Sequence, residues 1–377
     1  MINFPRWYCV VSYIFCSYLG LTPFAHAQFD PARVTPERPA IAARFAAPAV
    51  TYDTPGFRAG RTDFPSHAEV LAYAEALARQ SPHLKVEPLG LTQQGRAMPL
   101  LVLADQGRFD ATRPTVLVIG QQHGNEPAGG EAALALAQQF AGPRAGLLQR
   151  VNLLIIPRGN PDGAERFVRA TASGVDVNRD HLLLGTPEGR MMADAILRYH
   201  PQVVMDLHEF TVAGRWASKF GVVQKYDGLL QAASVGNLDP QIAAVAEQLY
   251  LGNIRAALSG AGLTSFKYHT TAGGSAGDKT VSMGGVQPDT GRNVNGLRPA
   301  ISLLLEVRGV GLGRANFARR VHTQVLAASV ARATASGSRR SSASASPGDN
   351  NSSSAAGLLT SAKRSRTPGA GRPGIFR

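Results

Sequence analysis

The sequence predicts an α/β fold with a mostly parallel sheet in one domain. Short apolar runs rich in β-branched residues, such as residues 115–119 and 151–156, alternate with helical patterns along the chain. Strands that are apolar at nearly every position are typical of parallel sheets, because helices cover both of their faces. The length of 377 residues is sufficient to bury a large core, and we detect no internal repeat.

The first 27 residues have the three parts of a secretory signal peptide. One basic residue precedes a mostly apolar run over residues 7–21, and Ala25-His26-Ala27 provides a small-x-small cleavage pattern. The run is shorter than the roughly 20 residues that span a bilayer. We therefore predict cleavage after Ala27 and an exported protein, periplasmic or secreted, without an integral membrane segment. Both cysteines, Cys9 and Cys16, lie in this segment, so a metal site in the mature chain must use His and carboxylate ligands.

The predicted elements follow in order after an extended, Pro- and Ala-rich N-terminal lead-in over residues 28–65. Ser66 is expected to cap a helix through residue 78, and Gln94-Gly95-Arg96 is expected to join two strands in a hairpin. The strands of that hairpin are residues 85–91 and 98–103. The other predicted elements are strands at residues 115–119, 151–156, 203–207 and 301–307 and helices at residues 130–140, 188–199, 239–258 and 316–333.

The formal net charge of +13 is unevenly distributed along the chain. Seven basic residues and one acidic residue lie in residues 334–377, which otherwise consist largely of Ser, Ala, Gly, Pro and Asn. Such a composition buries too little apolar surface to offset the entropy of ordering, so we predict a disordered basic tail. Elsewhere we find neither the basic helix nor the stacking aromatic residues of a nucleic-acid module, and we expect no nucleic-acid partner. The sequence leaves the oligomeric state open.

Four polar clusters end or follow predicted strands or open a turn, where open α/β sheets place their ligand sites. His123 and Glu126 are three residues apart and can meet one ion from a single turn, while His208 ends another buried strand. Two His and one Glu, with a fourth position left for water, form a catalytic zinc set. Glu209 is an alternative ligand to Glu126, although its side chain should point to the opposite face from His208. The clusters are His123-Gly124-Asn125-Glu126, Asp176-Val177-Asn178-Arg179, Asp206-Leu207-His208-Glu209 and Leu305-Glu306-Val307-Arg308.

Glu306 and two arginines outside these clusters are candidates for further groups that metal-assisted amide cleavage needs. A zinc-activated water needs a base, and Glu306 at the end of a buried strand is the candidate. The alternative for Glu306 is an ordinary ion pair with Arg308. The tetrahedral oxyanion needs a fixed cation besides zinc, and Arg166 and Arg169 lie close enough in the sequence to the Asn178-Arg179 pair to contribute one.

The Asp176 cluster suits substrate binding and ligand orientation. The guanidinium fork of Arg179 matches a carboxylate bidentately, and Asn178 adds a neutral donor. Asp176 is suited to accept the free N–H of a ligating His and so to orient its ring.

Taken in order, these motifs resemble the zinc carboxypeptidase family over about residues 66–333. The resemblance implies a three-layer α/β/α sandwich around a mixed, mostly parallel, twisted sheet. It implies one Zn²⁺ ion on His123, Glu126 and His208, with Asp176 as the hydrogen-bond partner of His123. The motifs are Leu89-Gly90, Gln94-Gly95-Arg96, His123-x-x-Glu126, Gly159-Asn160-Pro161-Asp162-Gly163, Gly174-Val175-Asp176-Val177-Asn178-Arg179, Asp206-Leu207-His208 and Leu305-Glu306.

The resemblance also implies roles in catalysis. Arg169 would stabilise the oxyanion, Asn178 and Arg179 would hold the terminal carboxylate of the substrate, and Glu306 would be the general base. The implied function is that of an exported zinc-dependent metallopeptidase of carboxypeptidase type. Its substrate would be a peptide or amide with a free carboxylate next to the cleaved bond.

One departure from the family keeps a second function open. The peptidases usually place a mobile Tyr before the general base, whereas residues 283–286 contain none and the nearest is Tyr268. A missing Tyr also fits the related succinylglutamate desuccinylase/aspartoacylase group, which are zinc-dependent deacylases of N-acyl amino acids. The Gly- and polar-rich residues 269–298 are expected to form a substrate-covering loop, in which Asp289, Arg292 and Asn293 act in recognition or in turns.

Overall fold

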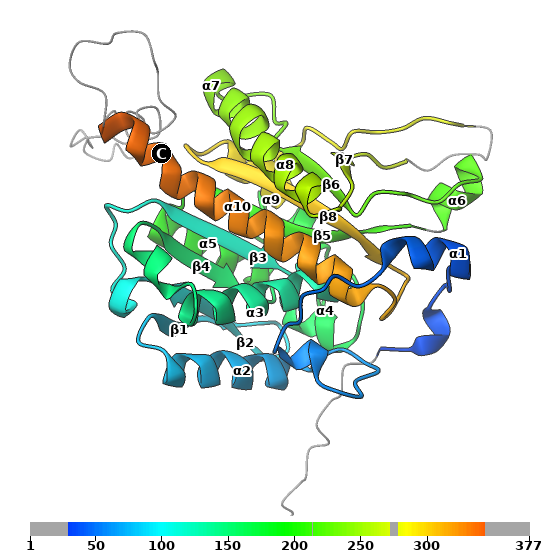
Figure 1. Cartoon of the computed structure of the whole chain (residues 1–377), viewed down its shortest axis with the longest axis horizontal. Helices are drawn as coiled ribbons and strands as arrows, with labels where there is room; N and C mark the ends of the chain where they lie inside the picture. Colours follow the sequence, from blue (N-terminus) through cyan, green and yellow to red (C-terminus); the bar gives the residue numbers. More distant parts are fainter. Residues whose placement is uncertain (1–28, 213, 272–277, 344–377) are drawn as a thin grey trace, which may run out of the picture.

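The computed structural model describes residues 29–212, 214–271 and 278–343. It contains an eight-stranded sheet in the order β1-β2-β4-β3-β5-β8-β6-β7 (Figure 1). The predicted signal peptide lies outside the described residues. The strands are β1 (Leu84–Leu91), β2 (Ala97–Leu103), β3 (Thr115–Gly120), β4 (Asn152–Ile156), β5 (Val203–Thr211), β6 (Gly228–Ala232), β7 (Ser265–Lys267) and β8 (Ile301–Val310).

The sheet is mixed and mostly parallel, which confirms the predicted fold class. Strands β4, β3, β5 and β8 run parallel in its centre, and β6 and β7 are also parallel to each other. The pairs β1–β2, β2–β4 and β6–β8 are antiparallel. The central strands are buried at nearly every position, as expected for a sheet that helices cover on both faces.

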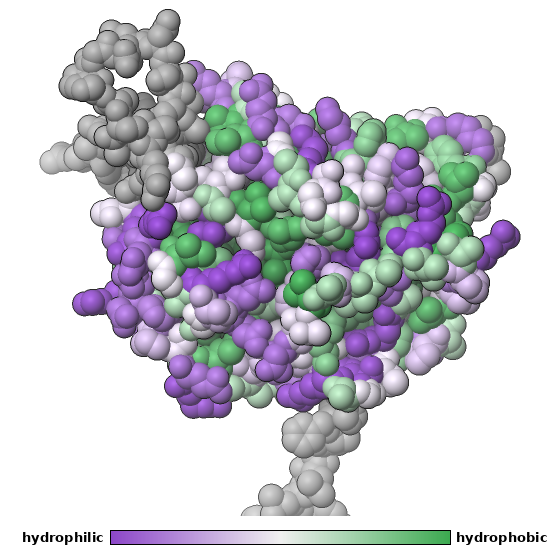
Figure 2. Space-filling model, in the orientation of Figure 1, coloured by the Kyte–Doolittle hydropathy of each residue, from purple (hydrophilic) through white to green (hydrophobic). Residues whose placement is uncertain are grey.

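Helices form a layer on each face of the sheet. One apolar core joins the sheet to α2, α3, α8 and α10, and a second joins it to α5 on the other face (Figure 1). On the face that carries α2 and α10, hydrophilic and apolar residues are interspersed (Figure 2). The helices are α1 (Pro39–Ala42), α2 (His67–Gln80), α3 (Pro127–Ala141), α4 (Pro161–Glu165), α5 (Pro187–Tyr199), α6 (Arg215–Phe220), α7 (Pro240–Ala244), α8 (Gly252–Gly260), α9 (Gly291–Gly296) and α10 (Phe317–Ala343).

Local sequence signals account for several element boundaries. Ser66 caps α2 through a capping box, in which its side chain accepts from the N–H of Glu69 and the Glu69 carboxylate accepts from the Ser66 N–H. The predicted hairpin joins β1 to β2. The predicted helix over residues 239–258 forms as α7 and α8 with a π-helical stretch, Val245–Leu251, between them.

Two predicted boundaries need correction. Helix α10 continues to Ala343, past the expected end at residue 333, because Ala335 packs into the core with 2% of its surface exposed. The remainder of the predicted tail, residues 344–377, lies outside the described residues. The lead-in is not simply extended, since it contains α1 and three short 3₁₀ turns and buries Phe45 and Tyr52.

Among the residues that the structure describes, no helix has both the length and the apolar character needed to cross a bilayer.

Candidate active site

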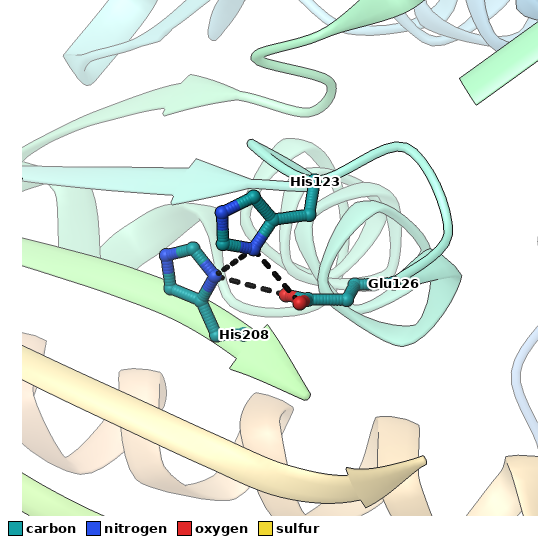
Figure 3. Close-up of side chains that lie close together, drawn as sticks. All are labelled: His123, Glu126 and His208. Atoms are coloured by element: carbon teal, nitrogen blue, oxygen red, sulfur yellow. Dashed lines mark hydrogen bonds and ion pairs between the residues drawn. The ribbon is translucent and has the colours of Figure 1, made fainter. Parts of the chain in front are cut away.

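The three predicted metal ligands converge at the carboxyl ends of two central strands (Figure 3). His123 follows β3, Glu126 directly precedes α3, and His208 lies on β5, which pairs in parallel with β3. The Nδ1 atom of His123 lies 2.8 Å from Oε1 of Glu126, and the Nδ1 atom of His208 lies 2.9 Å from Oε2. The two Nδ1 atoms are 3.1 Å apart. All three side chains are buried.

The protonation of the two rings makes this cluster suitable for a cation. The Nε2 atom of His123 lies 3.0 Å from Oδ1 of Asp176, and Nε2 of His208 lies 2.9 Å from Oδ1 of Asp206. Because an ionised carboxylate only accepts hydrogen bonds, Nε2 carries the hydrogen in both rings. The Nδ1 atoms of both rings face the Glu126 carboxylate, and a bound ion would receive their lone pairs. A tetrahedral zinc ion separates its ligand atoms by roughly 3.3 Å, close to the observed 2.8–3.1 Å.

Electrostatics support the same assignment. Burial alone would lower the pKa of His208, but the carboxylates of Asp206 and Glu126 raise it well above its usual range. The pocket formed by these groups therefore stabilises positive charge. The residues present fit a Zn²⁺ ion in donor type, burial and spacing.

A buried polar chain supports His208 and was not anticipated from the sequence. Gln122 Nε2 donates to Asp206 Oδ1 at 2.6 Å, and His181 Nε2 lies 2.7 Å from Gln122 Oε1. Burial lowers the pKa of His181 to about 4, so its ring is neutral at pH 7 and donates this bond. A sequence signal existed, because Asp206 stands two residues before His208 and thus on the same face of β5.

The predicted oxyanion-binding arginine lies beside the metal cluster. Arg169 Nη2 is 2.9 Å from Asp176 Oδ2, and its Nη1 is 3.5 Å from Glu126 Oε1. Its side chain is half-exposed and lines the cavity described below. The other candidate, Arg166, instead donates to the backbone oxygen of Thr171 at 2.9 Å.

The two predicted substrate-binding residues differ in their exposure to solvent. Asn178 is buried, its Nδ2 lies 3.1 Å from His208 Nε2, and its Oδ1 accepts from the N–H of Gly291. Arg179 is half-exposed and lies 3.9 Å from Asp289, so its guanidinium is accessible. Of the pair, Arg179 is therefore the group placed to receive an anion from solvent.

Glu306 lies on β8, directly beside His208 in the strand register. Burial raises its pKa to about 7. The alternative pairing with Arg308 is not observed, because Arg308 forms a buried two-point ion pair with Glu37 of the N-terminal segment. The carboxylate of Glu209 is also engaged elsewhere: it accepts from the N–H of Ala128 and pairs with Arg320.

These groups line one cavity of about 710 Å³. His123, Glu126, Arg169, Asn178, Arg179 and Glu306 all contribute to its wall. Tyr268 and, from the predicted loop of residues 269–298, Arg292 also line it. The charge of Glu306, and then burial, raise the pKa of Tyr268 well above its usual range.

Comparisons with known proteins agree with this geometry. A model of the zinc carboxypeptidase family matches residues 70–190. Carboxypeptidase 2 of Trichophyton rubrum is 31% identical over 304 residues, covering 77% of this chain and 56% of that protein. Carboxypeptidase 2 of Trichophyton equinum is 30% identical over 275 residues, covering 70% and 51%. This chain carries a zinc carboxypeptidase domain.

Solved structures show the fold of this zinc carboxypeptidase domain in other proteins. A metallo-carboxypeptidase from Burkholderia cenocepacia superimposes with a TM-score of 0.54 at 20% identity, covering 72% of this chain and 69% of that one. Carboxypeptidase A from Helicoverpa armigera gives 0.53 at 17% identity, covering 79% and 78%. The chain spans about half the length of the fungal relatives.

Proposed function

We propose that this protein is a zinc-dependent metallopeptidase of carboxypeptidase type, which hydrolyses the bond next to a carboxylate-bearing C-terminal residue. One observation carries the proposal: His123 and Glu126, two members of the buried cluster that also contains His208, line the same cavity as Glu306 and Arg179. A cation site, a base and an accessible guanidinium are the three groups that such a cleavage requires. The family match supports the same reaction class.

Each side chain of the site has a separate role in the proposed reaction. Zinc, when bound to His123, Glu126 and His208, would polarise the scissile carbonyl and acidify a water molecule. The Glu306 carboxylate takes a proton from the attacking water and passes it to the leaving nitrogen. Arg169 adds positive charge next to the developing oxyanion. Arg179 binds the terminal carboxylate and so fixes which bond reaches Glu306.

Glu306→Gln tests the assignment of the base. We expect kcat/KM on an N-blocked dipeptide to fall by about 10²–10⁴-fold, because one general base is lost. Zinc content should not change, since Glu306 is not among the ligands. Glu75→Gln makes the same chemical change on the exposed surface of α2 and serves as the control. Full activity of Glu306→Gln, or no bound zinc in the wild-type protein, would refute the proposal.

The same preparation distinguishes peptidase from deacylase activity. We expect cleavage of N-blocked peptides and little turnover of N-acetyl or N-succinyl amino acids. Turnover of the acylated amino acids alone would replace the peptidase proposal by the deacylase alternative.

We further propose that the protein is exported and processed. The support is the signal-like pattern of residues 1–27 and the small-x-small sequence Ala25-His26-Ala27. N-terminal sequencing of protein recovered from outside the cytoplasm should begin at Gln28. Recovery of the intact N-terminus from the cytoplasmic fraction alone would contradict export.

A further inference from the structure

Arg292 is a buried cation in the wall of the candidate active site. It lies on α9, lines the same cavity as Glu306, and has 5% of its surface exposed. Its guanidinium contacts only neutral acceptors, and among the described residues no carboxylate forms an ion pair with it. The contacts are Nε to Asn293 Oδ1 at 3.2 Å, Nη1 to Gln231 Oε1 at 2.7 Å, and Nη2 to Gly285 O at 2.9 Å and Ser234 Oγ at 3.3 Å.

Two other buried arginines of this domain form ion pairs with carboxylates. Arg308 pairs with Glu37, and Arg320 pairs with Glu209, each with both side chains buried. Burial of a charge without a counter-ion is unfavourable, and burial lowers the pKa of Arg292 accordingly. A cation held in this way in a cavity wall attracts an anion that enters the cavity.

The cavity gives access to the guanidinium on the side of Gly284. Gly284 has φ +84° and lines the cavity. A Cβ atom at that position would lie 3.4 Å from Arg292 Nη1 and 3.1 Å from the ring of Tyr268. A side chain at this position would therefore crowd Nη1 and its partner Gln231, and glycine avoids that obstruction. Gln231 is the one partner of Nη1 among the described residues, so one of its two N–H groups remains available.

Arg179 and Arg292 lie at different depths of this cavity. The side chain of Arg179 is 52% exposed, whereas Arg292 is buried. We propose that Arg292 binds a carboxylate on the side chain of the substrate's C-terminal residue, so that the enzyme prefers substrates ending in an acidic residue. This inference rests on the proposed function, in which Arg179 holds the main-chain carboxylate. A neutral terminal side chain would leave Arg292 without a counter-ion.

The first test compares zinc-loaded protein on N-blocked tripeptides that differ only in a terminal Glu or Gln. We expect kcat/KM to be about tenfold or more higher for Glu, as for charge-assisted hydrogen bonds elsewhere. Arg292→Gln should remove this preference and change cleavage of the Gln peptide by less than about threefold. Arg255→Gln removes one arginine from the surface of α8 and controls for net charge.

Two outcomes of this test would overturn the inference. The first is the absence of a Glu preference in the wild-type protein. The second is an equal loss on both peptides in Arg292→Gln, which would mean that Arg292 binds the main-chain carboxylate or only supports the loop. If Arg292→Gln does not fold, the wild-type preference decides, and Arg292→Lys should retain only part of it because Lys lacks the fork.

A binding measurement separates failure of this inference from failure of the proposed function. Calorimetry on zinc-loaded Glu306→Gln should show L-glutamate binding about tenfold more tightly than L-glutamine. The difference should disappear when Arg292→Gln is added. If no peptide is cleaved but this difference is present, the peptidase proposal fails and the acidic-ligand site stands. Equal binding of the two amino acids overturns the site.

Discussion

Replacement of Asp206 should weaken zinc binding although Asp206 is not a ligand. Its Oδ1 atom accepts from His208 Nε2 at 2.9 Å and from Gln122 Nε2 at 2.6 Å. Asp206→Ala leaves both buried donors without a partner and frees the imidazole to rotate. Loss of such a partner typically lowers metal affinity by about 10–100-fold, which corresponds to about 1.4–2.7 kcal/mol. Asp206→Asn keeps an oxygen for both donors and removes only the charge, so it should lose about tenfold or less.

Competition with a chromophoric zinc chelator measures these affinities directly. Asp194→Ala changes an exposed aspartate on α5 and should bind zinc like the wild-type protein. Circular dichroism in the presence of EDTA checks that each metal-free variant is folded. Wild-type zinc affinity in Asp206→Ala would refute the argument that this carboxylate orients His208. Equal losses in the Ala and Asn variants would show that charge, not the acceptor, is what matters.

Three further predictions concern other parts of the domain. Burial raises the pKa of Glu306 to about 7, and because the base must be ionised, kcat/KM should fall on acidification below about pH 7. Bound zinc shifts this fall in kcat/KM to lower pH. A flat pH profile from pH 8 down to pH 4 would contradict the assignment of Glu306 as the base. Glu37→Ala removes the ion-pair partner of the buried Arg308 and should lower the free energy of unfolding, measured in urea, by about 3–5 kcal/mol. Asp30→Ala removes one member of an exposed ion pair and should change the free energy of unfolding by less than about 1 kcal/mol. A Cβ at Gly124 would overlap the backbone of α4, so Gly124→Ala should displace the loop that carries two ligands and lower zinc affinity in the chelator assay; unchanged affinity would contradict this.

The metal ligands could be predicted from the sequence because their relative positions depend on short-range geometry. His123 and Glu126 are separated by one turn that follows a recognisable strand, and β3 and β5 are the kind of apolar run that predicts neighbouring central strands. The pairing of Gly120 with Leu207 brings His208 next to them. Asp206 and His208 share a face of β5, but a shared face does not specify a hydrogen bond between the two side chains, so this partner of His208 was missed.

Other parts of the fold depend on contacts that leave no periodic signal. Strand β7 has three residues and two of them are exposed, so nothing in its pattern distinguishes it from a loop. Helix α10 extends into a Ser- and Gly-rich stretch because Ala335 finds a place in the core. The orientation of the Arg292 side chain is set by hydrogen bonds to Gln231 and Ser234, which precede it by about 60 positions in the chain.

The site is therefore built from two parts that should respond differently to mutation. The metal cluster lies on strand ends and a helix start, whose positions are fixed by the central sheet. The wall with Arg292 comes from the predicted loop of residues 269–298, with Tyr268 directly before it, and a hydrogen bond from the Gly291 N–H to Asn178 ties this loop to the cluster. Arg292→Gln should consequently alter substrate preference while zinc affinity stays near the wild-type value, and Asp206→Ala should do the reverse. A parallel loss of zinc in Arg292→Gln would show that the two parts form one structural unit.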